Sequence, residues 1–290
     1  MKRGLIPALW RSVRPHQWLS NLVVFGALVF SRNLFDVSLL LMTTGGFVLL
    51  CGLSSAIFLV NDLVDRDRDR QHPVRRHRPL AAGEISERQA VAAAIVLALG
   101  ALAGAFVWQL GFALAAAGYL LVSVAYSLGL RHQPVLDVLT IAAGLVLRAV
   151  AGALLIQVSI SPWLYLGVGG LGLILALGRI QHEMRLAAAA GILEQGKYSL
   201  DAVTQMNSVT MTSTLMVYCL YTFLAPGFES NHLMMLTIPT VIYGLFRYRY
   251  LTIKHAGDQS PEQLMLSDAP LLIAVALWVA TASAVLYLGI

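Results

Sequence analysis

The sequence predicts an all-α membrane protein, built as a single bundle of nine transmembrane helices over residues 1–290. Its composition is the first reason, since hydrophobic residues make up 58% of the chain and charged residues only 12%. An ordinary soluble domain is about 25% charged. The second reason is that long apolar runs follow one another with short gaps. Lipid is therefore the expected solvent for most of the chain.

The apolar runs are each long enough to cross a bilayer as a helix, which takes about 20 residues. They are too long and too continuously apolar for the strands of a membrane barrel. Asn21 and Asn33 interrupt or bound the first run, and a tight turn is expected at Gly111, between the third and the fourth. We expect the spans at 18–35, 38–60, 89–108, 112–130, 137–157, 161–178, 203–224, 232–248 and 269–289.

The lysine and arginine residues indicate which helix ends face the cytoplasm. With the N-terminus inside, the inner segments and their borders hold 18 of the 20 Lys and Arg residues, a bias typical of cytoplasmic loops. The net charge of +5 then reflects topology and attraction to anionic lipid headgroups, not binding of nucleic acid. We expect a multi-pass protein of the cell (inner) membrane. Its cytoplasmic segments would be 1–17 (a tail without a signal-peptide core), 61–88, 131–136, 179–202 and 249–268.

A dense cluster of carboxylates follows the second expected span. Asn61, Asp65 and Asp69 are spaced four residues apart and Asp62 lies one turn before Asp65, so the four side chains would line one face of a continuing helix. Like charges on one face repel each other unless a cation lies between them. Mg²⁺ characteristically binds a few carboxylates together with substrate phosphates. We therefore predict a Mg²⁺ site on these four residues.

Two groups of arginines accompany the aspartates. The first group would neutralise them as surface pairs if the segment were only a solvated loop, and it consists of Arg66, Arg68 and Arg70. The second group would bind phosphate oxygens bidentately beside a Mg²⁺ site, and it consists of Arg75, Arg76 and Arg78. Taken alone, the second group is equally consistent with topology and lipid headgroup contact.

Arg148 lies inside the fifth expected span, where a charge costs about 2.5 kcal/mol or more and normally faces a polar cavity or a partner. Asp137 lies about three turns earlier, on nearly the same face. A cavity between them that opens inward would bind a charged substrate. The alternatives are a structural Asp137–Arg148 arrangement and an arginine that extends to the membrane surface.

The end of the sixth expected span offers weaker candidates. Arg179 and Glu183 are four residues apart, which is typical of an ordinary helix-end salt bridge. Lys197 and Tyr198 close the loop that follows.

The run Asn61-Asp62-x-x-Asp65-x-x-x-Asp69 resembles the first aspartate motif of the UbiA superfamily of intramembrane prenyltransferases. Further segments, spread over most of the chain, look like the branch of that superfamily that contains decaprenyl-phosphate phosphoribosyltransferase. They include Arg14-Pro15-His16-Gln17-Trp18, His72-Pro73-x-Arg75-Arg76-x-Arg78-Pro79 and Leu147-Arg148-Ala149.

The resemblance implies a Mg²⁺-dependent transferase with a cytoplasm-facing active-site cavity. Its donor would be 5-phosphoribosyl 1-diphosphate, its acceptor a polyprenyl phosphate of the decaprenyl type, and diphosphate would be released. Carried over, Asp62, Asp65 and Asp69 are the catalytic residues, and with Asn61 they hold Mg²⁺ on the donor diphosphate. The residues implied for substrate binding are Asn61, Arg75, Arg76 and Arg78 on the donor phosphates, Lys197 and Tyr198 closing over the donor, Arg148 and Arg14 on the lipid phosphate, and Glu183.

One departure from the family pattern bears on the donor. Prenyl-transferring members carry a second aspartate-rich motif after helix six, whereas this chain has Arg179-Ile180-Gln181-His182-Glu183 there. The phosphoribosyl branch is more basic at the same place. Two other functions stay open: a prenyltransferase that moves a prenyl group from a prenyl diphosphate to an aromatic or other small acceptor, and a transporter or lipid-binding scaffold. The sequence is also compatible with a homo-oligomer.

Overall fold

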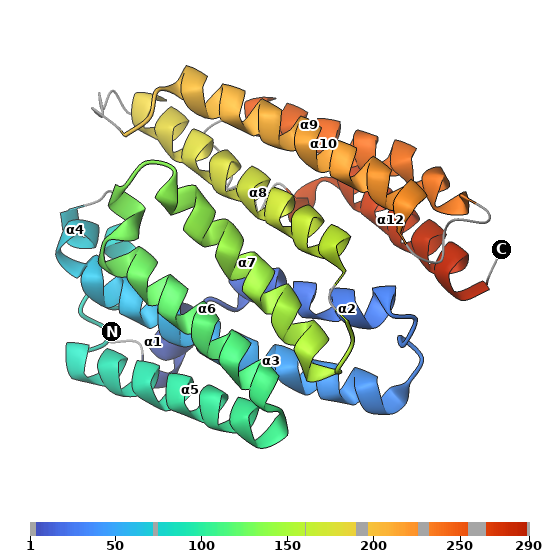
Figure 1. The fold of residues 1–290 in the computed structure, drawn as a ribbon. Coiled ribbons are helices and arrows are strands. Elements are labelled where there is room, and N and C mark those ends of the chain that lie inside the picture. The colour runs from blue at the N-terminus through green and yellow to red at the C-terminus, as the bar shows by residue number, and fades with distance from the viewer. Residues whose placement is uncertain are drawn as a thin grey trace. The chain divides into compact units, whose positions relative to one another are not determined.

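The computed structural model of this chain describes residues 4–71, 75–159, 161–189, 197–225, 232–254 and 265–288, and every regular element within them is a helix. The chain divides into two compact units, residues 1–160 and 161–290. Figure 1 shows the helices of both units. The all-helical fold expected from the sequence is confirmed for the described residues.

The first unit contains four long helices and several short ones. The long helices are α3 (Val37–Val64), α5 (Glu87–Trp108), α6 (Leu110–Leu128) and α7 (Leu136–Leu155). The short elements are α1 (Leu5–Ser12), η1 (Pro15–Val24), α2 (Phe25–Phe30), α4 (Arg66–Gln71), η2 (Arg75–His77) and η3 (Leu130–His132), where η marks a 3₁₀ helix.

Side-chain caps fix where the long helices of this unit begin. The Asp36 side chain accepts a hydrogen bond from the backbone N–H of Leu39 at the start of α3. Ser86 and Gln89 form a reciprocal capping box at the start of α5. Such caps pair the backbone donors that the first turn of a helix leaves open. Gln109 caps α6 through Phe112, so the turn after α5 lies at Gln109 and not at Gly111 as we expected.

The core of the first unit forms where the long helices meet. Helix α3 packs against α5 and α6, α6 packs against α7, and η1 lies against α3 and α7 (Figure 1). Leu53, Phe112, Tyr119 and Leu155 are among the buried side chains that these elements share. This packing holds the C-terminal end of α3 beside η1 and α6.

The second unit contains α8 (Pro162–Ala189), α9 (Leu200–Leu224), η4 (Leu233–Thr237), α10 (Ile238–Lys254) and α12 (Ala269–Leu288). Helix α9 packs along α8, and α10 packs against α12 and α9. Ser199 caps α9 by accepting from Ala202. Ile174, Met211 and Tyr248 form a buried cluster that joins α8, α9 and α10.

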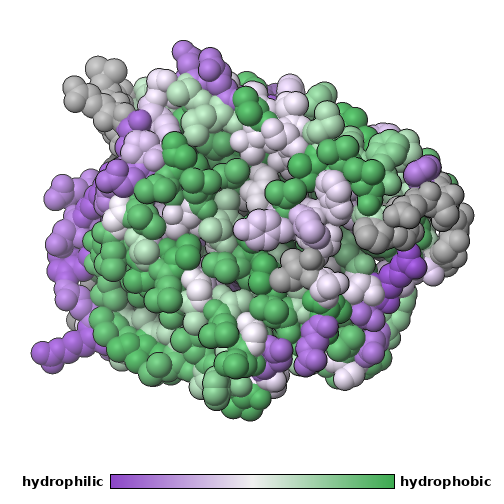
Figure 2. Space-filling model, viewed as in Figure 1, coloured by the Kyte–Doolittle hydropathy of each residue, from purple (hydrophilic) through white to green (hydrophobic). Residues whose placement is uncertain are grey.

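The outward-facing side chains of α5 show that its surroundings are apolar. The helix buries small residues such as Ala94 and Ala105, while Val96, Leu99 and Phe106 are each more than 60% exposed. A helix in water would place such large apolar side chains inward. In Figure 2 hydrophobic residues cover most of the face shown, and hydrophilic residues lie mainly along its edges, including the left edge, where Figure 1 places α4.

Six described helices are long and apolar enough to cross a membrane: α3, α5, α6, α7, α8 and α12. The protein is therefore a multi-pass membrane protein, whereas nine spans stay a prediction. The expected span 18–35 forms η1 followed by α2, and the spans 203–224 and 232–248 form α9 and α10, which are outside the set of six. Many Thr and Ser side chains lower the hydropathy of α9, and α10 has only 17 residues.

Several helices continue into segments that we expected to be loops. Helix α3 ends at Val64, α8 at Ala189 and α10 at Lys254, each beyond its expected apolar span. Polar and charged residues at these helix ends lower the mean hydropathy of the segment, but the backbone stays helical. The segments 61–88 and 179–202 therefore contain the ends of helices, which can hold side chains in fixed positions.

Candidate active site

The aspartate motif lies at the junction of α3 and α4. Asp65 follows the last residue of α3 and precedes α4, and its backbone N–H donates to Asn61 at 2.9 Å. The N–H of Asp69 donates to the carbonyl of Asp65 at 2.8 Å. The helical path thus continues through the junction, as predicted. The four polar side chains nevertheless separate into two groups instead of sharing one set of partners.

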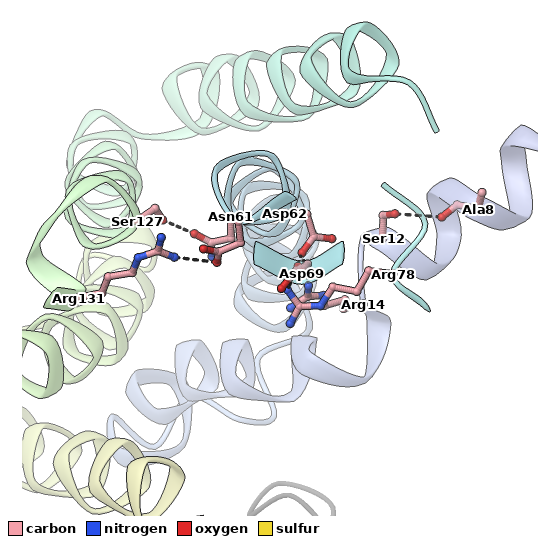
Figure 3. Close-up of polar contacts among 10 residues, drawn as sticks. Ala8, Ser12, Arg14, Asn61, Asp62, Asp69, Arg78, Ser127 and Arg131 are labelled. Carbon is pink, nitrogen blue, oxygen red and sulfur yellow. Dashed lines mark hydrogen bonds and ion pairs between the residues drawn. The ribbon is translucent and has the colours of Figure 1, made fainter. Parts of the chain in front are cut away.

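The first group consists of Asp62 and Asp69, with Arg78 contacting both and Arg14 contacting Asp62. Arg78 Nη1 lies 2.7 Å from Asp69 Oδ2 and 3.2 Å from Asp62 Oδ1. Arg14 also pairs with Asp62 Oδ1. Both aspartates are buried, with exposed fractions of 2% and 1%. Figure 3 shows the two carboxylates gathered beside Arg14 and Arg78.

Each of these carboxylates keeps one buried oxygen without a hydrogen-bond partner in the described part of the chain, Asp62 Oδ2 and Asp69 Oδ1. An unsatisfied buried acceptor costs about 1–3 kcal/mol, and more when it is charged. The oxygens therefore suit a hard cation, because Mg²⁺ binds through one or two carboxylates, water and substrate phosphates. No group of three or more His, Cys, Asp or Glu side chains in the described residues is arranged to hold a metal. The open oxygens of Asp62 and Asp69 fit a cation site, and the predicted site on all four residues stays a prediction.

The second group consists of Asn61 and Asp65, which face α6 and η3. Arg131 Nη1 donates to Asp65 Oδ2 at 2.7 Å, and the Ser127 hydroxyl donates to the side-chain oxygen of Asn61. Figure 3 shows Asn61 turned toward Ser127, with Arg131 nearby. Asp65 and Asn61 thus anchor the α3 end to α6 and η3, and their predicted role as metal ligands stays a prediction.

In the solvated-loop alternative, neighbouring arginines neutralise the aspartates at the surface. Among the described contacts, Asp67 is the aspartate that has such partners. Arg66 and Arg70 lie 3.5 and 3.6 Å from Asp67, whose side chain is 85% exposed. Arg66 also pairs with Glu87 at the start of α5. Asp62, Asp65 and Asp69 pair instead with arginines distant in sequence.

The backbone of Arg14 has an unusual conformation. Its φ of 50° and ψ of 65° fall in the left-handed region, which costs an L-residue about 1–2 kcal/mol. This conformation begins η1 and directs the side chain to Asp62. The guanidinium also lies 5.4 Å from the ring of Phe58 on α3.

The basic run after α4 is only partly at the aspartates. Arg78 is there, whereas Arg76 is exposed and its side chain contacts His77. Arg75 is half-buried in the same turn, η2. Residues 72–74 of the expected motif lie outside the described residues. The predicted roles of Arg75 and Arg76 are therefore still predictions.

Arg148 belongs to a polar network inside the helix bundle. Its Nη2 donates to the Tyr119 hydroxyl at 2.6 Å, and its guanidinium carbon lies 4.3 Å from the centre of that ring. Tyr119 also contacts Ser54 at 3.1 Å, and Ser54 donates to Asn21. Asp137 accepts from the N–H of Val138. The hydrogen-bond partner of Arg148 thus comes from α6 and is not Asp137, as it would be in the structural alternative.

Among the described residues, the partners of Arg148 are neutral. Its Nε atom is buried and has no hydrogen-bond partner there. Burial of an uncompensated guanidinium is unfavourable. An arginine in this situation is suited to bind an anion.

The candidates of the second unit lie near the end of α8 and the start of α9. Arg179 and Glu183 form the expected salt bridge at 3.6 Å, with both side chains about half exposed. The Lys197 ammonium lies 5.8 Å from the Tyr198 ring. Their roles over the donor are untested by these contacts.

Arg131, Ser127 and Tyr119 are the site residues that the sequence did not predict. Arg131 was attributed only to the positive charge of inner loops. Ser127 contacts Asn61 across two helices, a relation that spacing along one helix does not show. For Arg131 and Ser127 the available signal was therefore position near the end of an expected span, which does not identify a partner.

Comparisons with known proteins agree with the resemblance inferred from the motifs. The sequence pattern of the UbiA prenyltransferase family matches residues 21–269. A decaprenyl-phosphate phosphoribosyltransferase of Mycobacterium tuberculosis is 30% identical over 99% of this chain and 96% of its own. One from Mycolicibacterium smegmatis is 31% identical over 98% of this chain and 94% of its own.

A solved structure resembles the fold of the whole chain. It is a UbiA homolog from Archaeoglobus fulgidus bound to DMAPP and Mg²⁺, with a TM-score of 0.73 over 96% of this chain and 98% of its own. Its sequence identity is 22%, so this likeness concerns the fold alone.

Proposed function

We propose, on the premise that this chain belongs to the UbiA prenyltransferase family and is a membrane transferase, that it is a polyprenyl-phosphate phosphoribosyltransferase. It would transfer the 5-phosphoribosyl group of 5-phosphoribosyl 1-diphosphate to a polyprenyl phosphate of the decaprenyl type and release diphosphate. The relatives that match nearly the full chain and carry this name support the reaction.

The observation that carries the proposal is the buried pair Asp62 and Asp69, each with an open oxygen beside Arg14 and Arg78. Carboxylates bind a divalent cation, and the cation and the arginines together bind a diphosphate. Mg²⁺ held on these oxygens would supply charge neutralisation and orientation of the leaving diphosphate. Asp65 and Asn61 hold the end of α3 in place for this arrangement.

The chain's own residues contribute mainly positioning and charge. Arg78 bridges the two aspartates and keeps further guanidinium donors for a donor phosphate. A lipid phosphate oxygen forms the new bond to C1 of the ribose while the bond from C1 to the diphosphate oxygen breaks. The lipid phosphate is already anionic near pH 7, so the step requires no general base, and orientation and electrostatic stabilisation dominate.

Arg148 is our candidate for binding the lipid phosphate. It is half-buried, and its partners in the described residues are neutral. Arg14 was a second candidate, and its contact with Asp62 favours a role beside the carboxylates. Arg75 and Arg76 on the donor, and Glu183, Lys197 and Tyr198 in the second unit, complete the proposed set.

The proposed orientation places the N-terminus, α4 and the aspartate pair on the cytoplasmic side of the inner membrane. The donor is a soluble, highly charged sugar phosphate, whereas the acceptor is a lipid. A site at the membrane surface on the cytoplasmic side is open to both. The distribution of Lys and Arg supports this orientation.

The test is a donor comparison with the purified full-length protein, Mg²⁺ and a polyprenyl phosphate. Labelled 5-phosphoribosyl 1-diphosphate should give a lipid-soluble product, and Asp62→Asn and Asp69→Asn should lower the rate at least about 100-fold. Asp67→Asn is the matched control, because Asp67 lies on α4 with Asp69 but its side chain is 85% exposed.

A parallel reaction supplies a prenyl diphosphate and an aromatic acceptor. Consumption of that donor, with no phosphoribosyl lipid formed by the folded protein, would replace the proposal with the prenyltransferase alternative. Absence of any product from both donors would argue against transferase activity on either substrate.

A further inference from the structure

A second group of cationic side chains lies in the second unit, where α8, α9 and α10 approach one another. Arg249 Nη1, on α10, donates to the side-chain oxygen of Gln181 on α8 at 2.7 Å. Arg185 Nη1, on α8, donates to the backbone carbonyl of Thr252 on α10 at 2.7 Å. The two arginines therefore cross-link the same pair of helices within one helical turn of each other.

A chain of neutral side chains holds Arg249 in place through hydrogen bonds. Gln181 is 2% exposed, and its NH₂ donates to Thr204 on α9 at 2.9 Å. Its oxygen also accepts from Asn207, a fully buried residue of α9, at 3.3 Å. With both ends of the amide engaged, Gln181 is fixed, and it fixes one nitrogen of the Arg249 guanidinium.

The two arginines lack a compensating anion among the described residues. Their hydrogen-bond acceptors are an amide and a carbonyl. Both side chains are half-buried. Burial lowers the pKa of the Arg249 guanidinium, and the positive charge of Arg185 lowers it further. Two like charges held close together in partly buried positions are unfavourable unless an anion joins them.

Phosphate is the anion that this geometry suits. A guanidinium has five N–H donors in a planar fork, and each of these two uses one in the described contacts. The remaining donors can bind phosphate oxygens bidentately. The nearby carboxylate of Glu183 is paired with Arg179 instead, so nothing in this group attracts a divalent cation.

We infer that Arg185 and Arg249 form a phosphate-binding site in the second unit that takes a phosphate monoester without a divalent cation, with Gln181 as its positioning residue. This rests on the proposed function only for the choice of ligands. The 5-phosphate of a phosphoribosyl donor and the headgroup of a polyprenyl phosphate are both phosphate monoesters. The same site chemistry would recognise either.

Binding measurements on the full-length protein in detergent, with EDTA present, test the inference. The probes are ribose 5-phosphate, farnesyl phosphate and, as an uncharged control, ribose. At least one phosphate monoester should bind, and Arg249→Gln and Arg185→Gln should each weaken that binding about tenfold or more. Lys254→Gln removes one exposed charge from the same helix and should change the affinity less than about twofold.

The comparison of the two phosphates identifies the source of the ligand. Tighter, Arg249-dependent binding of ribose 5-phosphate assigns the site to the sugar donor, and the same result for farnesyl phosphate assigns it to the lipid. Gln181→Glu would place a carboxylate against Arg249 and should also weaken phosphate binding, whereas Gln181→Met should weaken it less than Arg249→Gln does.

Two results would overturn the inference: no binding of either phosphate by protein that melts cooperatively, or equal affinities in the wild type and in both arginine variants. The Asp62→Asn variant separates this inference from the proposed function. It should lose phosphoribosyl transfer but keep phosphate binding in EDTA. If an Arg185 or Arg249 site binds phosphate but the wild-type protein shows no phosphoribosyl transfer, the proposed function fails and this inference stands.

Discussion

Arg131 and Asp65 form an ion pair 2.7 Å long although they are 66 positions apart. The pair ties η3, at the end of α6, to the junction of α3 and α4. Both side chains are mostly buried, with exposed fractions of 18% and 15%. The aspartate motif is thus held by two separate supports, Arg131 on one side and Arg14 with Arg78 on the other.

Arg131→Gln should therefore destabilise the protein by about 1.5–3 kcal/mol, the range for a hydrogen bond to a charged group. The physical reason is that the Asp65 carboxylate keeps its burial and loses its charged partner. Thermal unfolding in detergent measures the effect. The double variant Arg131→Gln with Asp65→Asn should be less destabilised than the sum of the two single variants. Strict additivity would show that the contact contributes nothing.

Magnesium should stabilise the folded protein through the Asp62 and Asp69 oxygens. A ligand at about 100 times its dissociation constant adds about 2.7 kcal/mol to the folded state, which corresponds to a rise in Tm of several degrees. The rise should disappear in Asp62→Asn and Asp69→Asn and remain in Asp67→Asn. An unchanged rise in all three variants would place the cation elsewhere.

Chelation offers a second readout of the same site. EDTA should abolish transfer while the far-UV circular dichroism stays that of a helical protein, because the aspartates keep their arginine partners without the cation. Unfolding of the protein by EDTA would contradict this and indicate a structural role for the metal.

Substitution of Arg148 should affect the lipid substrate and spare the donor. Arg148→Gln should raise the KM for polyprenyl phosphate about 10- to 100-fold, since a charge-assisted hydrogen bond contributes about 1.5–3 kcal/mol. Tyr119→Phe removes the hydroxyl that accepts from Arg148 and should raise the same KM by a smaller factor. Steady-state kinetics with each substrate varied in turn measure both effects. A rise in the KM of the donor alone would reverse the assignment of substrates.

The sequence predicted the elements of this fold better than their contacts. Apolar runs and the spacing of Asn61, Asp65 and Asp69 depend on neighbours along the chain, so run length identified the helices and spacing identified the candidate motif. The turn after α5 was predicted at Gly111, a flexible residue, but it lies at Gln109, whose side chain accepts from the N–H of Phe112 and so begins α6.

The partners of charged residues were beyond sequence reasoning. Arg148 and Asp137 lie on one face of α7, but Arg148 bonds to Tyr119 because α6 packs beside it. In the same way, Asp65 has an arginine of η3 as its partner, and Asp69 one from the turn after η2. Such choices depend on helix packing, which spacing along a single helix does not contain.

Gly152 provides a stability test of how η1 is held against α7. A Cβ atom added there would collide with the backbone carbonyl of Val24, the last residue of η1, whereas one added at Gly100 on α5 would meet nothing within 4 Å. Backbone cannot rotate away, so Gly152→Ala should destabilise the protein by about 1–3 kcal/mol, as overpacking does.

Gly100→Ala is the matched control and should be neutral or slightly stabilising, because alanine is favoured over glycine inside a helix by about 0.5–1 kcal/mol. Gly152→Ala should also lower activity, since η1 begins directly after Arg14 and a displaced η1 moves that side chain away from Asp62. Thermal unfolding and the transfer assay are run on both variants. Equal melting temperatures of Gly152→Ala and Gly100→Ala would show that η1 can shift against α7 without cost. The contact at Gly152 would then not be what positions Arg14.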